Sequence, residues 1–279
     1  MRLIAIWVGA VIGLLLLGLF GWRILDHRAD GAEMTRLRAL QPPDPARFHP
    51  AMLDGLPEAA QRFFRFAISA GTPLLRVAEI AMEGRFAMGT KGDPNAVDMT
   101  AEQVLAAPDG FVWKMSGGSG FMHISGSDSG VWTRFWLAGL LPVAHIGGNV
   151  DHARSAFGRM VAEALIWTPA ALLPGAGVTW QSVDPDTARV TVSHGGLVQS
   201  VELTVAADGS PVRVVFPRWS DANPDKTFRI QPFGATLSEY REFQGYRLPT
   251  HVQAGNFFGT DDYFPFFIVD VTTIRFPGP

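Results

Sequence analysis

Two charged residues whose types and spacing could do chemistry stand in the apolar segment "RSAFGRMVAEALIWTPAALLPG", which begins at Arg154. Arg159 and Glu163 are four residues apart, so on a helix they face the same way and can form an ion pair. Three interpretations stay open: an ion pair that fixes the helix to its partner surface, a polar group at the mouth of a cavity, or a general acid. A hydrolase that uses Glu163 or Asp128 requires a second polar group close by.

The other residues that could bind a metal or act as a nucleophile form no pattern. The seven histidines are scattered, with no two at metal-ligand spacing, and the adjacent Asp261 and Asp262 fit a loop tip. The absence of cysteine excludes disulfides, cysteine-based zinc sites and a lipid-modified cysteine. The sequence has no phosphate-binding loop, nucleotide fingerprint or Gly-x-Ser-x-Gly elbow. We therefore expect no metal and no cofactor, and we favour a binding protein over an enzyme.

The composition predicts a large apolar interior. Of 279 residues, 47% are hydrophobic and 18% charged, which allows a sizeable core and excludes disorder. The net charge of −3 gives no electrostatic reason to expect nucleic acid as a partner. Phenylalanine and tryptophan, at 20 and 8 residues, suit an apolar pocket better than a polar sugar-binding cleft. Arg159 and Glu163 would form its polar rim, and the residues expected to line it are Trp113, Trp132, Trp136, Phe157, Met160, Trp167 and Trp180.

The first segment of the chain predicts a membrane helix. No charged residue occurs from Leu3 to Trp22, which matches the ~20 residues of a membrane span. A cleaved signal peptide is the alternative, but its apolar core is shorter, about 7–15 residues, and small residues follow it. We expect residues 1–28 to be an uncleaved anchor. Arg2 precedes the apolar run, and the arginines that follow it favour a cytoplasmic C-terminal side: Arg23, Arg28, Arg36 and Arg38.

Beyond the anchor, residues 29–55 predict a helix and then a stiff spacer, because "QPPDPARFHP" is rich in proline. A single domain is expected over residues 56–279. Within it, apolar residues recur at helical spacing over 151–173, where Asp151 is the expected N-cap and Pro169 should kink or end the helix. The charged residues of this helix exclude a second membrane span.

Alternation of apolar and polar residues predicts around a dozen strands, as in "EIAMEGRFAM". The expected strands include 131–136, 227–231 and 235–243, and a Gly-Gly-Asn turn is expected between His145 and His152. Short connections such as "AADGSP" favour a large, curved antiparallel sheet or incomplete β-barrel. The central helix has an apolar face that must be covered, so we expect it to pack on the concave side of this sheet.

Five segments, in this order, carry a resemblance to a known family: "LPEAAQRFF", "GFVWKM", "GRMVAEALIWTPAALLP", "VTWQSVDPDTARVTV" and "VELTVAADGSPVRV". The chain resembles a bacterial family known only as a domain of unknown function, and the likeness runs from Leu56 to Arg218. A family without an assigned activity implies no mechanism.

A second resemblance is architectural. The segments "VAADGSPVRVVF" and "LSEYREFQGYRLPTHVQA", with Tyr240, Gly245 and Pro249, are similar to the second half of lipoprotein-carrier (LolA-like) folds. This resemblance implies an incomplete barrel that holds lipid or acyl chains on its concave face, with helices in the opening. The chain departs from such carriers because it keeps a helical anchor and has no cysteine for lipid attachment, which argues against shuttling.

Together the anchor and the resemblances favour a single-pass protein of the bacterial inner membrane. Its domain, expected in the periplasm, would bind an apolar ligand such as a lipid, an acyl chain or a lipoprotein. The arginine count around the anchor argues against this orientation. Two alternatives stay open: a structural or interaction module of an envelope complex without a ligand, and the hydrolase.

Overall fold

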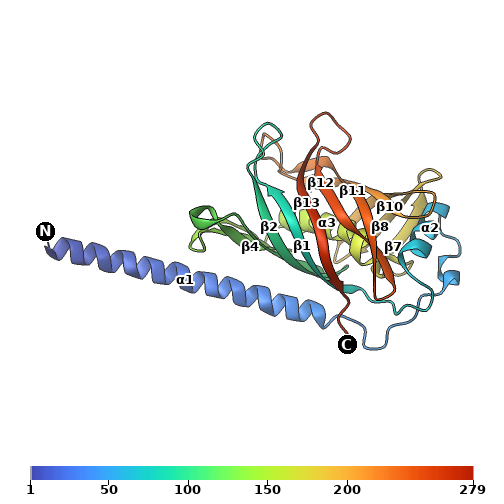
Figure 1. Cartoon of the computed structure of the whole chain (residues 1–279), viewed down its shortest axis with the longest axis horizontal. Coiled ribbons are helices and arrows are strands. Elements are labelled where there is room, and N and C mark those ends of the chain that lie inside the picture. The colour runs from blue at the N-terminus through green and yellow to red at the C-terminus, as the bar shows by residue number, and fades with distance from the viewer. Residues whose placement is uncertain (1, 279) are drawn as a thin grey trace.

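The computed structural model of the chain describes residues 2–278 and consists of a long N-terminal helix and a large curved sheet (Figure 1). All thirteen strands of the sheet pair antiparallel with their neighbours, which confirms the predicted fold class. The strands are β1 (Val77–Ala87), β2 (Ala96–Ala106), β3 (Gly110–Gly117), β4 (Ile124–Ser129), β5 (Trp132–Leu137), β6 (Leu141–Gly147), β7 (Val178–Ser182), β8 (Thr187–His194), β9 (Leu197–Val205), β10 (Pro211–Ser220), β11 (Arg229–Phe243), β12 (Tyr246–Asn256) and β13 (Phe264–Arg275).

The order of the strands explains why one helix interrupts a β chain. The sheet runs β6-β5-β4-β3-β2-β1-β13-β12-β11-β10-β9-β8-β7, so two meanders are joined by the pairing of β1 with β13. Its two edges are β6 and β7, and helix α3 (Val150–Trp167) is the segment that connects them. α3 packs on β9 and β10 and also contacts β3, β6 and β12. It therefore crosses the concave face from one edge to the other.

The ends of α3 follow from local chemistry. The side chain of Asn149 caps the helix by accepting a hydrogen bond from the His152 amide. The prediction that Asp151 caps the helix was wrong by two residues. The Asp151 carboxylate instead accepts a hydrogen bond from the Trp219 indole at 2.8 Å. The α-helix stops before Pro169, as predicted, and a short 3-10 helix, η3 (Pro169–Leu172), follows.

Helix α1 (Arg2–Arg38) lies on the opposite, convex face of the sheet. Its buried Met34 and Leu37 pack against the outward side chains of Val77, Val104 and Val112, whereas the residues that alternate with these face the main core. The predicted helix after the anchor is therefore continuous with the anchor helix. By length and composition the first part of α1 is able to cross a membrane, and its apolar side chains are exposed.

Helix α2 (Glu58–Ala67) covers the end of the sheet near β7, β8 and β9. Its buried Phe63 and Phe64 pack against Trp180, and the short helix η1 (Pro50–Leu53) precedes it. The chain of residues 39–57 therefore lies against the domain rather than acting only as a spacer, since Phe48 and Leu53 are part of the main core.

Two strand predictions were wrong. Residues 141–147 form the edge strand β6, where no strand was predicted, and β11 is continuous where two strands were expected. An edge strand tolerates Pro142, because it needs hydrogen bonds on one side only. β11 continues through Pro232 and Gly234, which pair with Pro217 and Val215 of β10. Gly234 leaves room for the Phe258 ring, which a Cβ would meet at 2.5 Å.

Candidate ligand-binding cavity

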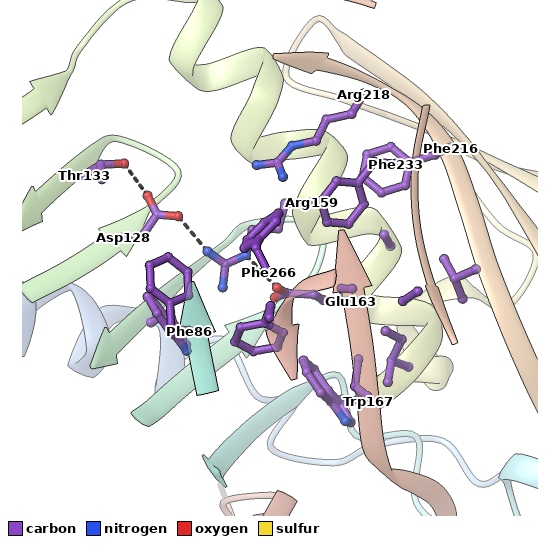
Figure 2. Close-up of a pocket in the computed structure, with 18 of the residues that line it drawn as sticks. Phe86, Asp128, Thr133, Arg159, Glu163, Trp167, Phe216, Arg218, Phe233 and Phe266 are labelled. Carbon is purple, nitrogen blue, oxygen red and sulfur yellow. Dashed lines mark hydrogen bonds and ion pairs between the residues drawn. The ribbon is translucent and has the colours of Figure 1, made fainter. Parts of the chain in front are cut away.

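A cavity of about 240 Å³ lies between α3 and the concave face of the sheet (Figure 2). Its walls come from α3, from β1, β3, β4 and β5 of one meander, and from β10 to β13 of the other. The residues that line it are Phe86, Trp113, Asp128, Thr133, Phe135, Arg159, Ala162, Glu163, Ile166, Trp167, Val214, Phe216, Arg218, Phe233, Ala235, Val252, Ala254, Phe266 and Phe267.

The cavity has a deep apolar part and a more open rim. Trp167, Phe216 and Trp113 are almost fully buried, with exposed fractions of 1%, 2% and 3%. Phe233 and Phe266 are only half-buried, and their rings lie 6.1 Å apart. An apolar group can therefore be enclosed at the deep end while a polar group attached to it stays near solvent.

A chain of charges connects α3 to β4 along one wall. Arg159 donates from Nε to Glu163 and from Nη1 to Asp128, each at 2.6 Å, which confirms the predicted ion pair and adds a second carboxylate. Gln103 donates to the other oxygen of Glu163, and Thr133 to the other oxygen of Asp128. All four carboxylate oxygens thus accept a hydrogen bond, and the helix is fixed to the sheet.

The surroundings of Arg159 favour its charged form. Burial alone would lower the pKa of Arg159, but Glu163 and Asp128 outweigh this effect and raise it. The guanidinium also lies over the rings of Phe111, at 4.7 Å, and Trp113, at 5.3 Å. The charge is therefore held in one place by two carboxylates and two aromatic faces.

Arg218 is a second guanidinium at the cavity, and it has no such partners. Among residues 2–278, none accepts a hydrogen bond from its Nε or forms an ion pair with it, and its charged group lies 4.8 Å from the centre of the Phe233 ring. Burial, together with the positive charge of Arg159, lowers the pKa of Arg218 to about 10. Figure 2 shows the side chain extending toward Arg159 without a bond to any residue drawn.

Two indole groups at the cavity also lack partners. Nε1 of Trp113 and Nε1 of Trp167 are buried and donate to no residue in the described chain. A buried donor without an acceptor costs about 1–3 kcal/mol, so such groups are uncommon in folded proteins. Two of the aromatic residues that line the cavity therefore carry an unsatisfied donor.

Four of the residues expected at the site lie together at this cavity: Trp113, Trp167, Arg159 and Glu163. Phe157 and Met160 are also on α3, but they line a separate hollow of about 200 Å³ beside Phe111. Sequence spacing identified the buried face of the helix, and this face is wide enough to border both spaces.

The other three expected residues have structural contacts elsewhere. Trp180 donates its indole hydrogen to the Leu172 carbonyl at 2.9 Å, under α2. Trp132 and Trp136 belong to β5 and face α1, where Trp136 donates to Asp26 at 3.1 Å. Trp132 and Trp136 are separated from the cavity because their side chains lie on the face of the sheet that α1 covers.

Several lining residues were not identified from the sequence, above all Arg218, Phe233 and Phe266. For Arg218 a signal existed, because Val214 and Phe216 point inward and the alternation of β10 continues to Arg218 on the same face. The two phenylalanines come from strands far along the chain, and only the closure of the sheet brings them to the helix.

The chain was compared with known proteins. None of the curated proteins matches it. Solved structures that are similar include a LolA superfamily protein from Nitrosomonas europaea, with 8% identity and a TM-score of 0.41 over 79% of this chain and 93% of that one. A DUF1329 family protein from Desulfovibrio piger has 10% identity and a TM-score of 0.39, over 81% and 92% of the two chains. A putative outer membrane lipoprotein-sorting protein domain from Vibrio parahaemolyticus has 10% identity and a TM-score of 0.36, over 72% and 85%.

At the sequence level the chain matches a family model described as a family of unknown function (DUF6544). The match extends over residues 46–268, from the segment before α2 to the middle of β13, and so includes α3 and nearly the whole sheet. The prediction of an uncharacterised family is confirmed: this chain belongs to the DUF6544 family.

Proposed function

We propose that this protein binds the apolar chain of a lipid-like molecule in the cavity between α3 and the sheet. The observation that carries the proposal is the cavity itself, whose walls are largely aromatic and aliphatic side chains. A folded protein packs its interior closely and leaves few voids larger than a water molecule. A space of about 240 Å³ that α3 covers without filling is therefore best explained by a ligand.

The size of the cavity limits the ligand. Sites that bury drug-sized ligands measure about 300–1,000 Å³, and this one is somewhat smaller, at about 240 Å³. It has room for one chain, or part of one, and not for several chains side by side. The rest of a larger molecule would extend past the half-buried phenylalanines of the rim.

The donors without partners indicate the chemistry of the other end of the proposed ligand. Arg218 offers a guanidinium whose Nε has no acceptor in the described chain, whereas Trp113 and Trp167 belong to the deep apolar part. A carboxylate or phosphate would accept hydrogen bonds from this guanidinium and would compensate the charge of Arg218. The proposed ligand is therefore an amphiphile with one apolar chain and an acidic head group.

The hydrolase is less well supported. All four oxygens of Asp128 and Glu163 already accept hydrogen bonds, two of them from Arg159. A general acid or base must reach the reacting group with one of these oxygens. The arrangement favours a structural role for the two carboxylates. A structural module without a ligand would require that the cavity close in solution.

Binding can be measured on the full chain, transferred from detergent into amphipol. Lipid extracted from the purified protein would be identified by mass spectrometry, and fatty acids of increasing length would then compete with a fluorescent fatty acid. Each methylene buried should strengthen binding about fourfold, from about 0.8 kcal/mol per group, until the cavity is full. Affinity that does not depend on chain length would contradict the proposal.

Variants on α3 give the matched comparison. Ala162 borders the cavity, so Ala162→Phe should fill it and abolish binding of the fluorescent fatty acid. Ala153 lies on the same helix, at the separate hollow, and Ala153→Phe should leave binding unchanged. Arg218→Gln should weaken binding of the acid about 10- to 150-fold, from about 1.5–3 kcal/mol for a charged hydrogen bond, and that of the matching alcohol little.

We also propose that α1 anchors the protein in the inner membrane with the domain in the periplasm. The proposal rests on the length and composition of α1 and on a ligand that occurs in membranes. An alkaline phosphatase fused to the C-terminus is active only outside the cytoplasm. An inactive fusion at normal expression would place the domain in the cytoplasm and agree with the arginine count.

A further inference from the structure

The half of α1 that follows its apolar segment is firmly attached to the sheet. Asp26 accepts hydrogen bonds from the Trp136 indole at 3.1 Å and lies 3.3 Å from the guanidinium of Arg134. Asp30 accepts a hydrogen bond from Ser127 at 2.7 Å. Since these groups are buried or nearly so, the direction of α1 relative to the domain is fixed.

The contacts also show which end of the sheet faces the apolar segment. Asp30 meets Ser127, and Arg23, nearer the N-terminus, donates to Ser125 at 2.8 Å. β4 thus runs in the same direction as α1, and the residues before Ser125 must lie level with the apolar segment. Met122 precedes Ser125 by three residues. At about 3.3 Å per residue it lies up to about 10 Å beyond Ser125 toward the N-terminus of α1, a length of about two turns of helix.

Figure 1 agrees with this register. The β4 end of the sheet projects along α1 toward the N-terminus, whereas the β1–β2 and β12–β13 connections project away from the helix. We call the β3–β4 connection, residues 118–123, and the β5–β6 connection, residues 138–140, the tip loops. Both connections join strands of the same end of the sheet, since Ile124 pairs with Leu137.

The tip loops are apolar and exposed. Phe121 and Met122 have exposed fractions of 90% and 70%, and Leu141, next to the second loop, has 52%. No Asp, Glu, Lys or Arg occurs in residues 115–127 or 135–150. The β1–β2 and β12–β13 connections, by contrast, contain Lys91, Asp93, Asp261 and Asp262. Exposed phenylalanine and methionine in loops that contain no charged residue of their own are unusual on a surface that faces water.

We propose that the tip loops insert into the bilayer surface that α1 crosses and form a second membrane contact of the domain. The occupant of this apolar surface is lipid, because the adjacent segment of the same molecule is the one able to span a membrane. Trp22 and Trp136 pack edge to face at 5.5 Å where helix and sheet meet, and tryptophan is enriched at the membrane interface. The inference does not depend on the ligand proposed above.

The absence of cysteine allows a direct test in the full chain. Phe121→Cys and Leu141→Cys would each be labelled with the polarity-sensitive fluorophore NBD and reconstituted into phosphatidylcholine–phosphatidylglycerol vesicles. Lipids with a nitroxide on the acyl chain would then quench any label within the bilayer. Leu14→Cys in the apolar segment is the positive control, and Val198→Cys, exposed by 62% on β9, is the matched control away from the apolar segment of α1.

We expect blue-shifted emission and at least twofold stronger quenching at Phe121 and Leu141 than at Val198. Labels at the tip loops that are no better quenched than at Val198, while Leu14 is quenched, would overturn the proposal. Blue-shifted labels without quenching would also overturn it, since a second protein copy would then cover the loops. An unquenched Leu14 would overturn it as well, because α1 would not be inserted.

Discussion

Replacing Arg159 with methionine should lower the free energy of unfolding by about 3–5 kcal/mol, because two shielded carboxylates would lose their common cation. Arg159 donates to Asp128 and to Glu163, both at 2.6 Å. The exposed fractions of the three side chains are 18%, 20% and 14%, so water can replace little of the lost interaction. Methionine keeps an apolar side chain of similar length and so limits the cavity left by the change.

A comparison of variants separates the stability lost with the ion pairs of Arg159 from a general destabilisation of the fold. Glu163→Gln alone removes one charged hydrogen bond and should cost about 1.5–3 kcal/mol, since Asp128 still neutralises Arg159. The double variant should cost less than the sum of the two single changes, because only one carboxylate would then be unpaired. Arg189→Met is the matched control: its pair with Glu202 is exposed and should contribute about 0–1 kcal/mol.

Urea unfolding of the full chain in detergent, followed by circular dichroism, measures these differences. A loss at Arg159 as small as that of Arg189→Met, or single effects that simply add, would refute a structural ion-pair network. Retained stability in Glu163→Gln together with a lost enzymatic activity would instead favour the hydrolase.

Three further predictions use the same unfolding measurement. Burial raises the pKa of Asp30 above its ordinary value of 3.8, so the folded state keeps this proton to higher pH than the unfolded state. The free energy of unfolding should therefore fall as the pH rises from about 4 through the raised pKa. Asp30→Asn should remove this part of the pH dependence, and a variant with the same pH profile as the original chain would contradict the prediction. Asn149→Ala removes the helix cap bonded to His152 and should cost about 1 kcal/mol, whereas no change would mean that solvent replaces the cap. Tyr246→Phe removes the hydroxyl that accepts from the Leu75 amide at 2.8 Å and should cost about 1–3 kcal/mol; a neutral effect would show that this buried bond adds nothing.

Much of the fold could be predicted because its signals are local. Period-two alternation identified most strands, and the Asp-Gly turn identified the hairpin between β9 and β10. The helix after Asn149 was predicted from its apolar face and its end from Pro169. Edge strand β6 was missed because its pairing on one side only imposes a weak pattern, with Pro142 inside it.

The site was less predictable because its walls come from distant strands. The Arg159–Glu163 pair was visible from spacing alone, since both residues belong to one helix. That Asp128 joins them depends on how α3 lies across the sheet, which no local pattern encodes. The tryptophans show the same limit: Trp113 and Trp132 are both aromatic strand residues, yet one faces the cavity and the other faces α1.

The pairing of β1 with β13 has a consequence for how the protein is made. Each meander consists of hairpins between neighbours in sequence, which form quickly, but contacts such as Ile80 with Ile274 join the two ends of the domain. During synthesis β1 emerges before β13, which follows the other twelve described strands in the chain. Until β13 emerges, one side of β1 stays unpaired. The nascent chain thus has an open sheet edge for most of its translation, and this edge is where aggregation or chaperone binding should begin.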